Sequence, residues 1–265
     1  MNQTFKTSSA LSTSALSIAL FFQACGGSND SSSSSSSTST PSSAQVEQAA
    51  SSPEPTMANM KSAIVDAMQT ISADTVKEIT GLAKSQQAIA IPDSFEKVQS
   101  ALETAGKSDL FKGFSSSLND SAVSALGDYK GVLEDTISSL DLPAVEAIMK
   151  GGDDSITRYL ESAAGSQLKN NLVPFVKDAV KNAGAQEWID KIKDALPEDT
   201  GGLLGQVSAV TGVKLPTNFD VEGYVTNQLM GKFFNVMATQ EKLFRENPKG
   251  RSAELFEKVL EATAQ

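Results

Sequence analysis

Histidine is absent from the 265 residues, and cysteine occurs once, as Cys25. Without histidine the chain can form no Ser-His-Asp or Cys-His nucleophilic site and no metal site built on imidazole. A single cysteine has no partner within the chain, which excludes an intramolecular disulfide. Carboxylates, lysines, arginines and hydroxyls are the reactive groups that remain.

Positive charge is also scarce, since 22 Lys and Arg residues stand against 32 Asp and Glu residues, for a formal charge of −10. Sequence-independent nucleic-acid binding depends on Lys and Arg to neutralise phosphates. We therefore expect no nucleic-acid partner. The same acidic balance argues against an electrostatic hold on anionic lipid.

The first residues have the pattern of an export signal. Residues 1–9 carry one charge, Lys6, and no acid, and residues 10–22 are mostly apolar. That run is shorter than the roughly 20 residues of a membrane-spanning helix. The sequence FQAC, residues 22–25, resembles the bacterial lipobox, which implies cleavage before Cys25 and acylation of its thiol by a fatty acid such as palmitate. We expect residues 1–24 to be a lipoprotein signal peptide; the alternative is an ordinary signal with an incidental cysteine.

The segment after Cys25 contains almost nothing apolar to bury. It includes SSSSSSSTST and SSPEPT, a composition typical of disordered linkers. We expect residues 25–56 to be a flexible tether between a lipid anchor and a domain at 57–265. Gly26 replaces the aspartate that marks inner-membrane retention in many lipoproteins of double-membraned bacteria, which favours the outer membrane, facing the periplasm. Stable attachment to that membrane needs more than one acyl chain.

Residues 57–265 are numerous enough for one domain with a sizeable core. Their apolar residues recur at helical spacing, and alternating strand-like runs are hardly found. Glycine and proline breakers separate the stripes, as at Ile91-Pro92-Asp93, Ala105-Gly106, Leu142-Pro143 and Asn247-Pro248. We predict an all-α bundle of roughly eight to ten helices, with Pro174 near a helix start or kink. The stripes are Met57, Met60, Ile64, Met68 and Ile71; Val132, Leu133, Ile137 and Leu140; Leu168, Leu172, Val176 and Val180; and Tyr224, Val225, Leu229, Phe233 and Met237.

Several segments resemble a known family. They are IAIPDSFEKVQSALETAG (89–106), GGDDSITRYL (151–160), NLVPFVKDAVKNAG (171–184) and, most specifically, NFDVEGYVTNQLMGKFFNVMATQEKLFRENPKGRSAELFEKVL (218–260). Together they are similar to the bacterial lipoprotein family called domain of unknown function 4197. The resemblance covers nearly all of residues 57–262 and implies an all-helical exported domain. It implies no activity.

Two adjacent acids, Asp153 and Asp154, follow Gly151 and Gly152. They could hold a hard cation or act as acid and base, although the acid spacing of a calcium loop is absent. A structural interpretation also fits: Gly151 adopts the left-handed conformation that ends one helix, and one of the acids caps the next. Tyr159, on that next helix, is a further candidate ligand residue.

Two other groups of residues are candidates for binding. Arg245 and Arg251 flank Asn247-Pro248 and could clamp a phosphate or carboxylate, or could hold a helix corner through carbonyls and acids such as Glu246 and Glu254. Five aromatic residues near the C-terminus could line a pocket for an acyl chain or could be core. They are Phe219, Tyr224, Phe233, Phe234 and Phe244.

The absence of histidine favours a non-enzymatic module that binds a periplasmic partner or a small apolar ligand. The alternative is an enzyme with a carboxylate site near Asp153 and Asp154, which could depend on a metal. Ser94-x-x-Lys97 and Ser166-x-x-Lys169 fit a Ser-x-x-Lys spacing, but the companion motifs of penicillin-recognising enzymes are missing. We expect no cofactor.

Overall fold

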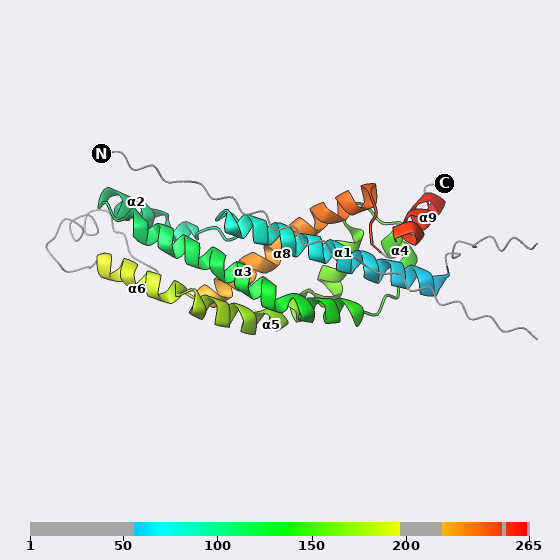
Figure 1. The fold of residues 1–265 in the computed structure, drawn as a ribbon, viewed down its shortest axis with the longest axis horizontal. Coiled ribbons are helices and arrows are strands. Elements are labelled where there is room, and N and C mark those ends of the chain that lie inside the picture. Colours follow the sequence, from blue (N-terminus) through cyan, green and yellow to red (C-terminus); the bar gives the residue numbers. More distant parts are fainter. Residues whose placement is uncertain (1–55, 197–218, 251–252, 264–265) are drawn as a thin grey trace, which may run out of the picture. The chain divides into compact units, whose positions relative to one another are not determined.

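The computed structural model describes residues 56–196, 219–250 and 253–263. The predicted signal peptide, Cys25, nearly all of the tether and Arg251 lie outside these ranges. The chain divides into two units, residues 1–49 and 50–265, and the described helices belong to the second. In the described ranges there are eight α-helices and one 3-10 helix, with no strand, which confirms the all-α prediction (Figure 1).

Four long helices build the bundle, and five shorter elements complete it. Helix α3 packs against α1, α5 and α6, and helix α8 packs against α1 and α5. None of the helices in the described ranges has an apolar stretch long enough to cross a bilayer. The long helices are α1 (Met57–Lys84), α3 (Ser108–Ser138), α5 (Ser155–Asn182) and α8 (Val221–Glu246); the shorter elements are η1 (Asp93–Phe95), α2 (Glu96–Thr104), α4 (Val145–Met149), α6 (Ala185–Ala195) and α9 (Ala253–Thr263).

The apolar stripes read from the sequence form the core. Most of their members are buried, because spacings of three and four residues place them on the face of each helix that meets its neighbours. Met57, at the start of α1, is 55% exposed, and Met60, Val132, Leu140 and Tyr224 are partly buried. The buried stripe residues are Ile64, Met68 and Ile71 on α1; Leu133 and Ile137 on α3; Leu168, Leu172, Val176 and Val180 on α5; and Val225, Leu229, Phe233 and Met237 on α8.

Helices α1 and α2 end in the same way, on one residue with left-handed backbone. Gly106 has φ of 69° after α2, and Lys107 N–H donates to Leu102 O at 2.8 Å. After α1 the same conformation is taken by Gln86, with φ of 60°. This termination satisfies the last carbonyls of a helix. The glycine made the first ending predictable, and Gln86 gave no such signal.

Pro174 lies in the interior of α5, so the prediction of a helix start there is wrong, and the alternative of a kink stays a prediction. A proline there has no N–H to donate to the carbonyl four residues earlier. Both Pro174 and its neighbour Val173 are exposed. A carbonyl left without its helical partner on an exposed face can be hydrated, which lets the helix continue.

Candidate functional site

A buried carboxylate from α8 caps the N-terminus of α5. Glu241 is 0% exposed, and its Oε1 accepts from Ile156 N–H at 2.9 Å. Its Oε2 accepts from Thr157 N–H at 2.7 Å and from Thr157 Oγ1 at 2.8 Å. The carboxylate satisfies backbone donors that have no partner within the helix, and its charge complements the helix dipole.

Arg245 completes this buried polar corner. Its Nε and Nη2 donate to Glu241 Oε1 at 2.9 and 2.8 Å, one helical turn away on α8. The same guanidinium donates to Met149 O and Ile148 O at 3.2 Å, beside the end of α4, and to Ser155 Oγ at 2.6 Å. Its side chain is 9% exposed. Arg245 therefore holds a helix corner through carbonyls, and its acidic partner is Glu241, not Glu246 or Glu254.

The capping prediction for residues 151–154 is wrong in two respects. Gly151 does not have left-handed backbone; within the described ranges, the positive-φ glycines are Gly106, Gly184 and Gly250. Gly151 is needed for space, because a Cβ there would collide with the Ser155 side chain, 2.6 Å from its Oγ. Asp154 occupies the N-cap position of α5 but makes no capping bond.

The two predicted acids pair with cations instead. Asp154 Oδ1 lies 2.7 Å from Arg158 Nη2, and Asp153 Oδ2 lies 3.7 Å from Lys242 Nζ. The Tyr159 hydroxyl donates to the Asp141 carbonyl, and partial burial together with the Asp141 charge raises the pKa of Tyr159. No group of three or more acids with the geometry of a metal site occurs among the described residues.

The five aromatic residues do not share one pocket. Tyr224 and Phe244 are 20 positions apart on helix α8, where a rise of 1.5 Å per residue separates them by about 30 Å along the axis. They form separate pairs: Phe219 with Tyr224 at 5.3 Å, Phe233 with Phe234 at 5.4 Å and Phe244 with Phe256 at 5.2 Å between ring centroids. Phe233 and Phe244 are core residues, 5% and 3% exposed.

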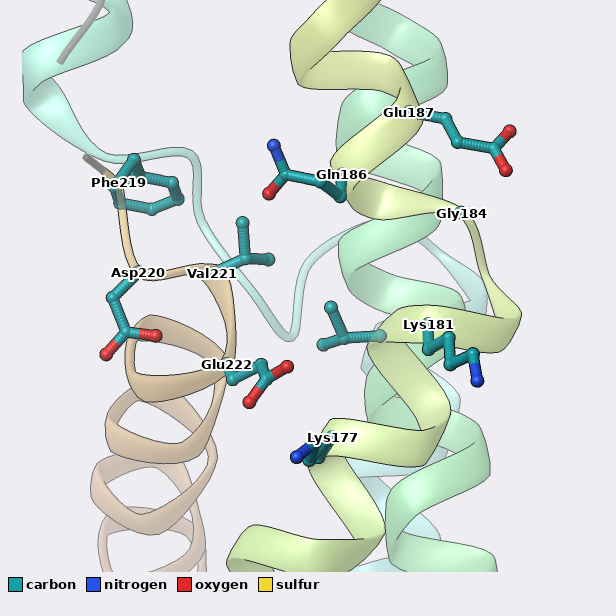
Figure 2. Close-up of a pocket in the computed structure, with 10 residues that line it drawn as sticks. Lys177, Lys181, Gly184, Gln186, Glu187, Phe219, Asp220, Val221 and Glu222 are labelled. Carbon is teal, nitrogen blue, oxygen red and sulfur yellow. The ribbon is translucent and has the colours of Figure 1, made fainter. Parts of the chain in front are cut away.

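Phe219 instead lines a pocket of about 550 Å³ between the α5–α6 corner and the start of α8 (Figure 2). The corner is made by Gly184, whose φ of 65° lets α6 begin directly after α5. Val180 and Val221, each 4% exposed, are apolar residues within the lining. The polar part of the lining comprises Lys177 and Lys181 of α5, Gln186 and Glu187 of α6, and Asp220 and Glu222 at the start of α8.

The charges of this pocket are largely unpaired. Lys177 and Glu222 point toward one another from α5 and α8 in Figure 2. In the described part of the chain, neither side chain has an oppositely charged group with a nitrogen–oxygen distance of 4.0 Å or less. Asp220 is engaged differently, because its Oδ1 accepts from Gly223 N–H at 2.9 Å and caps α8.

The sequence could have supplied part of this picture. Glu241 and Arg245 are four residues apart on a helical stripe, a spacing that predicts an ion pair. Nothing local shows that the pair is buried against residues 84 and 85 positions away. The pocket, likewise, joins residues of three helices that share no recognisable motif.

The described residues thus form an all-helical bundle with a buried polar corner at Arg245 and an open pocket beside Gly184. The family model described as "Protein of unknown function (DUF4197)" matches residues 50–261, and the chain belongs to that family. The searches found no match to a curated protein and none to a solved structure.

Proposed function

We propose that the chain is a lipoprotein of the bacterial envelope, anchored through Cys25, whose helical domain is a binding module and not an enzyme. Support for the anchor comes from the lipobox-like FQAC at 22–25 and from the serine-rich segment that follows. The outer membrane, facing the periplasm, is the location that Gly26 favours. Support for binding comes from the pocket between α5, α6 and α8.

One observation carries the binding proposal: the pocket is open while the other polar region is fully used. A volume of about 550 Å³ is within the range of small-molecule sites. Its lining combines two buried valines with the charges of Lys177 and Glu222, which have no ion pair among the described residues. At the Arg245 corner, by contrast, the carboxylate and the guanidinium are already bonded to protein groups. Of these two regions, therefore, only the pocket has charged groups available to a ligand.

The anchor is tested by metabolic labelling with a radioactive fatty acid. We expect the label in the native chain and none in Cys25→Ser. The variant should be found as an unprocessed or soluble form and not as a processed, membrane-bound one. A Ser variant that is still labelled would show that Cys25 is not the acylation site.

The binding site is tested by mass spectrometry of small molecules that co-purify with the full chain. Gln186→Trp places a large ring in the pocket from an exposed position on α6, and Gln167→Trp is the matched control at an exposed position of α5 outside it. We expect a molecule that co-purifies with the native chain and the control and is depleted in Gln186→Trp. Equal recovery from both variants, or no such molecule, would contradict binding at this pocket.

A further inference from the structure

The pocket presents opposite charges on opposite sides. Lys177 extends from α5 and Glu222 from the first turn of α8, and the two side chains face each other across the cavity (Figure 2). Lys181 lies one turn beyond Lys177, and it extends away from α8 together with Glu187. The cavity is thus faced by one cation, Lys177, and one anion, Glu222, which do not form an ion pair with each other.

Between these charges the lining can contact the uncharged, partly polar middle of a ligand. Val180 and Val221 supply apolar atoms to the lining. Gln186 extends from α6 toward the side of the cavity where α8 begins (Figure 2). A primary amide has two N–H donors and one carbonyl acceptor, which are the groups needed to pair with a peptide bond.

We propose that this pocket binds a short peptide as a zwitterion, with its carboxylate on Lys177, its ammonium on Glu222 and a backbone amide on Gln186. This inference rests on the proposed binding function and specifies its ligand. Charge-assisted hydrogen bonds at both ends are stronger than neutral ones. They fix the orientation of the ligand, and the valines contact its side chains.

Two other ligand classes fit the lining less well. A fatty acid would use Lys177 for its carboxylate, but its tail would lie against Glu222 and Gln186, which gain nothing from an apolar group. A polyphosphate would face the carboxylate of Glu222 across the same cavity. Like charges at close range oppose such a ligand.

Isothermal titration calorimetry of the purified full chain tests the ligand class with four defined probes. These are trialanine, its N-acetyl form, its C-terminal amide and octanoate. We expect trialanine to bind in the millimolar range or tighter. Each blocked form removes one terminal charge and should bind about tenfold or more weakly, the effect of losing one charged hydrogen bond.

Charge variants test the orientation. Lys177→Glu and Glu222→Lys should each weaken trialanine binding about tenfold or more, and the double variant should recover most of the loss, because it restores opposite charges with the ligand reversed. Lys169→Glu is the matched control: it is an exposed α5 lysine without an ion pair in the described ranges and outside the pocket, and it should bind as the native chain does.

The outcomes separate the two proposals. The zwitterion inference is overturned if the N-acetyl and C-terminal amide forms bind as tightly as trialanine. It is also overturned if Lys169→Glu weakens trialanine binding as much as Lys177→Glu does. Octanoate binding that Gln186→Trp abolishes, without trialanine binding, also overturns it but leaves a ligand-binding pocket. No binding by any probe, with no molecule co-purifying with the native chain, overturns both.

Discussion

The two ends of α8 hold polar groups in opposite states. At its C-terminal end, Glu241 and Arg245 are almost completely buried and are bonded to α4, α5 and each other. At its N-terminal end, Glu222 and the facing Lys177 line an open pocket and have no ion pair within the described ranges. One helix thus carries both the most buried charges of the described bundle and charges that remain available.

This difference distinguishes structural polar groups from candidate binding groups better than residue type does. Arg245 and Asp153 belong to residue types that bind ligands, and both were candidates from the sequence. Arg245 is engaged with protein carbonyls, and Asp153 lies 3.7 Å from Lys242. Charge in a conspicuous motif is therefore weaker evidence for a binding site than charge left unpaired beside a cavity.

Arg245→Met is the change that should affect stability most. It leaves the Glu241 carboxylate buried without its cation, and breaking a buried pair in this way costs about 3–5 kcal/mol. Chemical denaturation followed by circular dichroism measures the loss. Lys242→Met, which removes a cation from an exposed pair with Asp153 at 3.7 Å, should cost at most about 1 kcal/mol. Equal losses in the two variants would show that the polar corner does not stabilise the bundle.

Gly151→Ala tests the tight packing of the same corner. The new Cβ would collide with Ser155, whose Oγ bonds to Arg245, and overpacking of this kind costs about 1–3 kcal/mol. Gly152→Ala is the matched control, since the nearest atom to its Cβ would be Arg158 Nη2 at 3.6 Å. Thermal melts should show a lowered midpoint for Gly151→Ala alone. A similar shift in both would indicate that backbone freedom, and not space, is needed at this turn.

Tyr129 extends the comparison to a buried group that is neutral. It is 4% exposed and donates to Leu168 O at 2.9 Å, and burial raises the pKa of its phenol well above the usual value near 10. Because the folded pKa exceeds the unfolded one, the stability it contributes is complete below about pH 10 and is lost as the pH rises through the folded pKa.

Tyr129→Phe should therefore have two effects. Below pH 10 the loss of a hydrogen bond costs about 0.5–1.5 kcal/mol. Above pH 10 the stability of the variant should fall less steeply than that of the native chain in urea denaturation. Tyr224→Phe, at a residue that is only partly buried, is the comparison. Parallel pH profiles for the native chain and Tyr129→Phe would contradict the burial of an unionised phenol.

The sequence predicted the elements of the fold better than their connections. Stripes such as Leu168 to Val180 are local, so spacing alone identifies the buried face of a helix. Breakers at Gly106 and Pro248 also act locally. Glu241 was missed because it caps a helix more than 80 residues away. The expectation of a helix start at Pro174 was wrong because the exposed face of α5 tolerates a proline. The pocket depends on three helices meeting, which no single segment encodes.

The last comparison concerns two aspartates at equivalent helix positions. Asp220 and Asp154 are the N-cap residues of α8 and α5, but only the Asp220 side chain accepts a hydrogen bond from a backbone N–H of its helix, that of Gly223. Asp220→Ala should cost about 0.5–2 kcal/mol, the usual value for a lost cap. Asp154→Ala should cost at most about 1 kcal/mol, because it removes only a partly exposed ion pair with Arg158 while Glu241 still caps α5.

Asn variants sharpen this last prediction. Asp220→Asn keeps an acceptor for Gly223 N–H and should retain most of the stability that Asp220→Ala loses. Asp154→Asn and Asp154→Ala should be indistinguishable in thermal melts, because no capping acceptor is lost at that position. If Asp154→Ala cost as much as Asp220→Ala and Asn rescued both, Asp154 would cap α5 in solution. Glu241 would then be a second, redundant acceptor, and the polar corner would lose its status as the structural counterpart of the open pocket.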